Sequence, residues 1–341
     1  MVNERGANDS AKAARVSRLI LFVSFAALLA AVTACSDSKF APPEETGFTE
    51  DRFLITLSGG SPLGPEVVSL FDLSNSKVVA EAPGGYQTWA LYRESANELL
   101  VSTVGGEPFT GHLTVYDVAD TSSPVWTIVM ADRSQSTILA PAWALSEDER
   151  YLYYASRPST QQYAQLIKVI DLDLRGEIAR ARLSTNCDGY KILAPSGQSD
   201  ARVLCASAKV VTVSPAGAVS TIETLPLPQE AMSSIVNAKF RGCSGIGLTF
   251  PCVLGEHRRL MAYSLRSSHS LGGLVIYKTD EPSDYRIYQL RSGFIHFAPV
   301  GLTHAALLEA ETSDIYLLDF ATGRTELAFQ APPETHWLFA P

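Results

Sequence analysis

Ile167-Lys168-Val169-Ile170-Asp171-Leu172 is a short β-type run that ends in an aspartate and leads into a turn. Runs with aspartate in the same place recur as Val67-Val68-Ser69-Leu70-Phe71-Asp72-Leu73, Leu113-Thr114-Val115-Tyr116-Asp117-Val118 and Ile315-Tyr316-Leu317-Leu318-Asp319-Phe320. Weaker copies are Lys209-Val210-Val211-Thr212-Val213 and Leu274-Val275-Ile276-Tyr277-Lys278. No pattern of helical period persists for long, so the chain is predicted to be all-β.

The spacing of these runs lies near the range of about 40–50 residues that is typical of one β-propeller blade. A second repeated element precedes two of them, as Trp89-Ala90-Leu91 and Trp143-Ala144-Leu145. Each repeat is interpreted as an inner strand, a tight turn, a second strand, a third strand with the aspartate and an outer strand. The repeated tryptophans are expected to pack between blades. Six third strands predict a single propeller of six four-stranded blades, and the gap between Val213 and Leu274 leaves seven as the alternative. A β-sandwich is the main rival, but sandwiches rarely run this long with such a repeat.

The two ends of the domain predict how the propeller closes. From Asp51, three strands precede the first Trp-Ala-Leu element, so the first blade lacks its inner strand. The last residues, Glu334-Thr335-His336-Trp337-Leu338-Phe339, are similar to Tyr86-Gln87-Thr88-Trp89-Ala90-Leu91. We therefore expect the C-terminal strand to complete the first blade and to leave no exposed inner edge.

Two family resemblances follow from these motifs. Ala144-Leu145-Ser146-Glu147-Asp148-Glu149-Arg150-Tyr151-Leu152-Tyr153 resembles the S-x-D-G-x-x-L-Y phrase of YVTN and WD-type propellers, with Glu149 where those proteins usually place glycine. A turn of a less favoured type is therefore expected at Glu149. One blade, with Cys187-Asp188-Gly189-Tyr190, Pro195-Ser196-Gly197, Cys205 and Ala216-Gly217, resembles a disulfide-bearing blade of the heavy subunit of amine dehydrogenases. In that family the heavy subunit is a scaffold and the quinone belongs to a separate small subunit, so the resemblance implies no cofactor here.

The N-terminus resembles a bacterial lipoprotein signal peptide. Arg15 and Arg18 precede the apolar stretch 19–32, and Val32-Thr33-Ala34-Cys35 matches a lipobox that is cut before Cys35. The stretch is shorter than the roughly 20 apolar residues of a membrane-spanning helix. The predicted organisation is a signal peptide over 1–34, a flexible tether over 35–50 and the propeller over 51–341.

Lipidation of Cys35 would place the protein in the cell envelope. Acyl chains such as palmitate anchor a protein through about 0.8 kcal/mol for each buried methylene. Ser36 follows the cysteine, and resemblance to sorted lipoproteins then favours the outer membrane, on its periplasmic side or its surface, in a Gram-negative cell. An uncleaved anchor, or cleavage after Ala34 without lipidation, remains as an alternative.

The charge of the chain argues against nucleic acid as a partner. The chain has 27 Lys+Arg and 36 Asp+Glu, a net charge of -9, and loses four basic and two acidic residues with 1–34, which leaves -11. An acidic surface without a basic cluster does not suit phosphate neutralisation. Charge-driven adhesion to anionic lipid is disfavoured for the same reason.

The cysteines fit an oxidising compartment. With Cys35 assigned to lipid, Cys187, Cys205, Cys243 and Cys252 form an even set, as expected for disulfides. Three pairings are open, and proximity in sequence favours Cys187–Cys205 and Cys243–Cys252. A zinc site is the weaker alternative because no C-x-x-C spacing occurs.

Candidate catalytic residues are scarce in the sequence. None of the six histidines shows H-x-H or H-x-x-x-H spacing, and no G-x-S-x-G elbow is present, so no metal ligand and no catalytic residue is assigned. His296 and His336 lie in expected inner strands and are candidates to face a central channel, with packing or surface placement as the alternative. Asp171 and Asp173 are candidates for a cation, but the first is better explained as the repeat aspartate at a strand end and the second as a solvated residue.

These observations favour a non-catalytic, membrane-tethered binding or scaffold protein with an envelope protein or a small ligand as partner. The alternative is an enzyme or enzyme subunit, either similar to the amine dehydrogenase heavy subunit or a lactonase-like hydrolase with a channel metal.

Overall fold

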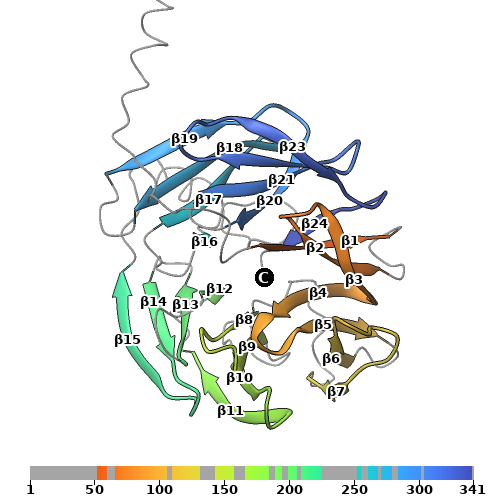
Figure 1. Cartoon of the computed structure of the whole chain (residues 1–341). Coiled ribbons are helices and arrows are strands. Elements are labelled where there is room, and N and C mark those ends of the chain that lie inside the picture. The colour runs from red at the N-terminus through yellow and green to blue at the C-terminus, as the bar shows by residue number, and fades with distance from the viewer. Residues whose placement is uncertain are drawn as a thin grey trace, which may run out of the picture. The chain divides into compact units, whose positions relative to one another are not determined.

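β-Strands make up nearly all of the regular structure (Figure 1). The computed structural model describes residues 52–59, 66–105, 110–130, 143–156, 166–183, 189–193, 199–205, 209–224, 252–254, 260–267, 270–278, 283–300 and 303–339, all within one compact unit. The helical element among them is a single 3-10 turn, η2 (Glu94–Ala96). Within those ranges no helix has the length and apolar character that crossing a bilayer requires.

The described residues form six antiparallel sheets of four strands, named A to F in chain order. Sheet A has the order β24 (Trp337–Phe339), β1 (Phe53–Ser58), β2 (Val67–Asp72), β3 (Lys77–Pro83). Sheet B has β4 (Tyr86–Arg93), β5 (Glu98–Gly105), β6 (Thr110–Asp117), β7 (Trp126–Val129). Sheet C has β8 (Trp143–Leu145), β9 (Tyr151–Ser156), β10 (Leu166–Asp171), β11 (Gly176–Arg182).

The remaining three sheets repeat the same up-and-down order. Sheet D has β12 (Gly189–Leu193), β13 (Ala201–Cys205), β14 (Lys209–Val213), β15 (Val219–Thr224). Sheet E has β16 (Cys252–Leu254), β17 (Leu260–Ser267), β18 (Ser270–Lys278), β19 (Tyr285–Gln289). Sheet F has β20 (Phe294–Val300), β21 (His304–Glu309), β22 (Asp314–Asp319), β23 (Thr325–Gln330). This succession of small sheets is a β-propeller-like fold.

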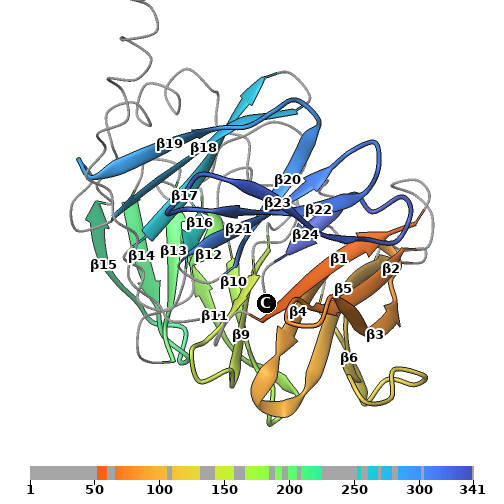
Figure 2. The same ribbon diagram turned by 45° about the horizontal axis from the view of Figure 1, so that its top comes forward.

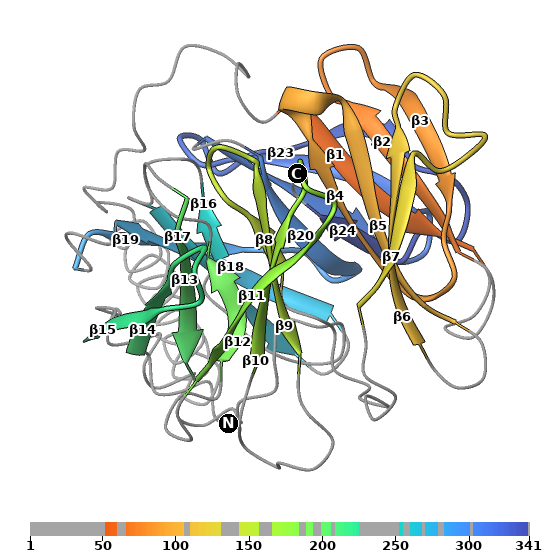
Figure 3. The same cartoon turned by 90° about the horizontal axis from the view of Figure 1, so that it is seen from below.

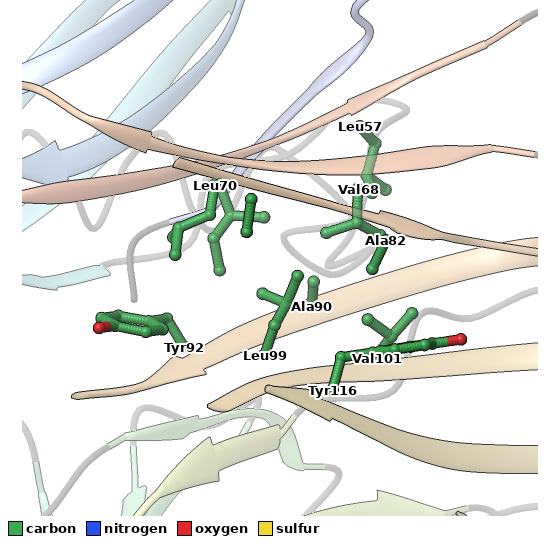
Figure 4. Packing of buried hydrophobic residues seen from close by; sticks show 11 residues of the cluster. Leu57, Val68, Leu70, Ala82, Ala90, Tyr92, Leu99, Val101 and Tyr116 are labelled. Carbon is green, nitrogen blue, oxygen red and sulfur yellow. The ribbon is translucent and has the colours of Figure 1, made fainter. Parts of the chain in front are cut away.

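Sheets A and B pack face to face through alternate residues of their strands. Leu57 and Leu70 of sheet A lie opposite Leu99 and Val101 of sheet B (Figure 4). Leu100, which lies between Leu99 and Val101 in β5, points to the opposite face of sheet B and packs with sheet C. Because successive strand residues face opposite sides, a strand with a sheet on each side needs an unbroken apolar run. Burying each such side chain contributes about 1.5–3 kcal/mol.

Similar clusters join sheet B to C, C to D, and F to A. Tyr153 and Val169 of sheet C pack with Val203 of sheet D, and Figure 3 shows β8 to β11 beside β12. Phe71 of sheet A stacks on Phe329 of sheet F with ring centroids 4.6 Å apart. Sheets A, B, C and D therefore share cores in succession, and sheet F shares a core with sheet A.

Sheets E and F also lie side by side, with β18 and β19 next to the strands of sheet F (Figure 2). The hydroxyl of Tyr288 on β19 donates a hydrogen bond to the carbonyl of Phe320, which follows β22. The centroids of the Tyr288 and Phe320 rings are 5.9 Å apart.

The repeat aspartate builds the hairpin between the third and fourth strands. Oδ1 of Asp72 accepts the backbone N–H of Ser74, Oδ1 of Asp171 accepts those of Asp173 and Leu174, and Oδ1 of Asp319 accepts those of Ala321 and Thr322. Such aspartate turns satisfy backbone donors that leave the sheet. The interpretation of Asp171 as the repeat aspartate at a strand end is confirmed.

In four sheets, the residue that lies four positions after the end of the third strand has a left-handed backbone. Gly217 and Gly323 occupy it with φ of 77° and 70°, whereas Ser76 and Arg175 occupy it with φ of 54° and 56°. A side chain costs energy in this region and glycine does not. The turn therefore imposes the conformation even where the sequence lacks glycine.

The expected strand order is confirmed, and the six runs singled out in the sequence all lie in third strands: β2, β6, β10, β14, β18 and β22. The C-terminal strand pairs with the first one, with Leu338 opposite Thr56 and Trp337 opposite Leu57 (Figure 1). Residues 225–251, the place considered for a seventh blade, lie outside the described residues, as do 1–51 with the predicted signal peptide and tether.

Candidate functional site

The starts of three first strands bring aromatic residues from sheets A, B and F together. The rings of His296 on β20 and Trp337 on β24 have centroids 4.1 Å apart, and those of Trp89 on β4 and Trp337 are 5.6 Å apart. All three are partly exposed. We call Trp89, His296 and Trp337 the aromatic cluster.

The tryptophans also pack between sheets, as the sequence predicted. Trp337 contacts the core between sheets A and B, and Trp89 contacts the core between sheets B and C. One part of each ring thus supports the framework and another part remains accessible. The side chain of Trp143 lies outside the described residues.

A buried carboxylate lies beside the aromatic cluster. Glu66, just before β2, is 5% exposed. Its Oε2 accepts the backbone N–H of Thr88 at 2.9 Å, and its Oε1 lies 3.1 Å from Nε2 of His336. The backbone N–H of His336 donates to the carbonyl of Leu57 at 2.9 Å. We call Glu66, Thr88 and His336 the carboxylate joint, since together they connect β2, β4 and β24.

In the carboxylate joint, Glu66 and His336 each shift the pKa of the other towards the charged form. Burial alone would raise the pKa of Glu66, but hydrogen bonds from His336 and Thr88 outweigh it and the pKa lies below the ordinary 4.5. The hydrogen bond to Glu66 raises the pKa of His336 above 6.5, against burial that lowers it. Both shifts favour a pair of opposite charges in the folded protein.

The predicted channel histidines thus have defined surroundings. His296 contacts Trp337 and His336 contacts Glu66. Sequence reasoning missed Glu66 and Thr88, which lie 270 and 248 residues before His336 in the chain. No local pattern distinguishes Glu66 from other acidic residues, so its role becomes visible only in the tertiary fold.

A second polar group joins sheets B and C. Arg93 bonds Glu98 of its own sheet at 3.1 Å and Asp173 of sheet C at 2.7 Å. Asp173 therefore pairs with arginine, and Asp171 pairs with Arg150 at 2.8 Å. Among the described residues no group of three or more His, Cys, Asp or Glu is arranged to hold a metal ion.

Glu149 departs from the expectation derived from the propeller phrase. Its φ is 52°, so the backbone adopts the left-handed conformation that glycine would favour. Its carboxylate accepts the N–H groups of Glu94 at 3.2 Å and Ser95 at 2.7 Å in η2. The side chain thereby connects sheets B and C, which glycine could not do.

The cysteine predictions remain untested. Cys35, Cys187 and Cys243 lie outside the described residues. Cys205 ends β13 and Cys252 begins β16, but their side chains also lie outside the described part.

Comparisons with known proteins give only distant structural likeness. No protein-family model matches the sequence, and no curated protein matches it. One similar solved structure is a nidogen/laminin complex, with a TM-score of 0.48 and 9% identity over 84% of this chain and 97% of that chain. Another is the dihydro-heme d1 dehydrogenase NirN in complex with DHE, with a TM-score of 0.42 and 11% identity over 84% of this chain and 55% of that chain. The fold assignment therefore depends on the six sheets themselves.

Proposed function

We propose that the protein is a lipid-anchored envelope β-propeller that binds a partner without catalysing a reaction. Its domain would be a closed ring of six blades. Five of the six contacts between neighbouring blades have direct support, namely A–B, B–C, C–D, E–F and F–A. Pairing of β24 with β1 would fasten the ring, because it joins the two ends of the domain within one sheet.

The aromatic cluster is the observation that carries the binding function. It combines rings from three sheets whose first strands would line the centre of the ring, where we propose that His296 and His336 face a channel. Aromatic side chains give large contact area at low entropic cost, and their faces suit flat or apolar partners. A rigid frame with partly exposed rings at its centre is suited to binding.

The repeat carboxylates have structural roles that account for their presence. Asp72 and Asp171 hold turns and pair with arginines, and Asp173 links two sheets. Their placement therefore needs no catalytic explanation. Cysteine pairs at Cys187–Cys205 and Cys243–Cys252 would add structural disulfides in an oxidising envelope.

A capture experiment with the full-length lipidated protein tests the binding function. The wild type, His296→Ala and Trp89→Leu are compared with Ile287→Ala, a control on β19 whose side chain is 43% exposed. We expect the same envelope protein or small ligand to be retained by the wild type and the control and lost from the two cluster variants. Equal retention by all four proteins, a stoichiometric metal ion or turnover of a substrate would overturn the proposal.

Metabolic labelling with palmitate tests the membrane anchor independently. We expect label on the wild type and none on Cys35→Ala, together with loss of the variant from the outer-membrane fraction. Label that persists without Cys35, or a wild type that is never labelled, would refute lipidation at this residue.

A further inference from the structure

We propose that His336 stabilises the C-terminal strand β24 in the first sheet in a pH-dependent way, because its protonated form holds β24 in place. The imidazole lies immediately before β24 and bonds to Glu66 of another part of the same sheet. It would act in this way whether or not the aromatic cluster binds a partner.

Both ring nitrogens of His336 face oxygen acceptors. Nε2 lies 3.1 Å from the Oε1 of Glu66, and Nδ1 lies 3.1 Å from the backbone carbonyl oxygen of Glu334. A neutral imidazole carries a proton on only one nitrogen, whereas an imidazolium donates from both. Only the protonated ring can therefore satisfy the two contacts, and loss of the proton sets a nitrogen lone pair against an oxygen.

Glu66 is held in place independently of His336. Its carboxylate is 6% exposed and accepts the N–H of Thr88 through the other oxygen. The backbone carbonyl of Glu66 also accepts the N–H of Gly84 at 2.7 Å. Because Glu66 is fixed on both sides, it cannot simply turn towards water when His336 loses its proton.

The other groups around His336 have little opposing charge. Among the described residues, β1 contributes the backbone carbonyl of Leu57, and β4 contributes Thr88 and Trp89, which do not titrate in this range. The side chain of Glu334 is exposed. From β20, the ring of His296 contacts that of Trp337, the residue after His336, and His296 is the one further titratable group among the described residues that needs a control.

The sign of the pH dependence follows from the two shifts. The pKa of His336 is raised by Glu66, so its contribution is complete below 6.5 and is lost as pH rises through the higher folded value. The pKa of Glu66 is lowered, so its contribution is complete above 4.5 and is lost as pH falls through the lower folded value. The joint is thus strongest between pH 4.5 and 6.5, and loss of the His336 proton at higher pH weakens the attachment of β24, and of Trp337 with it.

Hydrogen exchange of the C-terminal peptide tests this role of His336 in the full-length protein. After correction for the intrinsic pH dependence of exchange, we expect the protection of β24 to fall about two- to fivefold between pH 6 and pH 8.5, the scale of a partly exposed ion pair. His336→Gln and Glu66→Gln should remove this change, and His296→Gln should retain it. An equal fall in the wild type and in His336→Gln would overturn the proposal.

Nitrogen NMR of the histidine rings in the wild type gives a test that needs no variant to fold. We expect His336 to be an imidazolium at pH 6.5 and to titrate above that value. A neutral His336 ring at pH 6.5 would overturn the proposal.

Discussion

Replacing Asp72 by asparagine should destabilise the protein at neutral pH through loss of one charge. The carboxylate is 1% exposed, and hydrogen bonds from Arg52 and Ser74 outweigh burial and lower its pKa to about 2. Its ordinary pKa is 3.8, and each unit is worth about 1.4 kcal/mol, so the shift corresponds to at most about 2.4 kcal/mol. The side chain of Arg52 is 50% exposed, and solvent screening reduces the expected loss to about 1–2 kcal/mol.

Asparagine keeps the turn but not the pairing. Its Oδ1 can still accept the N–H of Ser74, whereas an amide NH₂ would replace the Oδ2 that now accepts from Arg52 and Asn75. The matched control is Asp117→Asn in sheet B, because Asp117 is exposed and Asn97 stands at the position of Arg52. We expect the control to change the free energy of unfolding by no more than about 0.5 kcal/mol.

Urea unfolding at several pH values decides the outcome. A carboxylate with a lowered pKa contributes stability above 3.8 and loses it as pH falls towards 2, so the difference between wild type and Asp72→Asn should be largest at pH 7 and shrink below pH 4. A double-mutant cycle with Arg52→Gln should show that most of the loss depends on the arginine. A loss that equals that of Asp117→Asn, or that stays constant down to pH 2.5, would refute the reasoning.

Three further substitutions and one control substitution test other parts of the account by chemical unfolding. Ser76→Gly should stabilise the protein by about 0.5–1 kcal/mol because φ is 54° there, and a loss of stability would contradict the left-handed turn. Glu149→Gly should bring no such gain, since it removes the acceptor of two N–H groups in η2, and a gain as large as that of Ser76→Gly would show that those bonds contribute nothing. Leu100→Ala should cost about 2–5 kcal/mol because its side chain is fully buried between sheets B and C, whereas Leu327→Ala, at 59% exposure, should cost less than about 0.5 kcal/mol; equal costs would contradict the packing.

The repeated part of the fold was accessible from the sequence because it is governed by local rules. Short β-type runs that lead into turns, such as 167–172, identify strands, and aspartate at the strand end identifies the hairpin. Pairing of β24 with β1 could also be predicted, since the Trp-Leu-Phe segment resembles the first strands of other blades. These inferences need only the neighbouring residues of each motif.

The candidate site was less accessible because it depends on contacts between distant segments. Glu66 and His336 are 270 residues apart and meet only through the tertiary fold, and although His336 lies in the C-terminal repeat element, Glu66 lies in no motif. Glu149 shows the opposite difficulty. The local rule favours glycine at this turn, but the contact of Glu149 with η2 of the neighbouring sheet B explains the glutamate. Such a contact between sheets leaves no local signal in the sequence.

The most direct test of the central claim is a crystal structure of the mature chain from Cys35 to Pro341. We predict six blades in a closed ring, with sheet D packed against sheet E and β24 hydrogen-bonded to β1 inside the first blade. A seventh sheet between β15 and β16, an open gap between sheets D and E, or a β24 that lies away from β1 would contradict this claim.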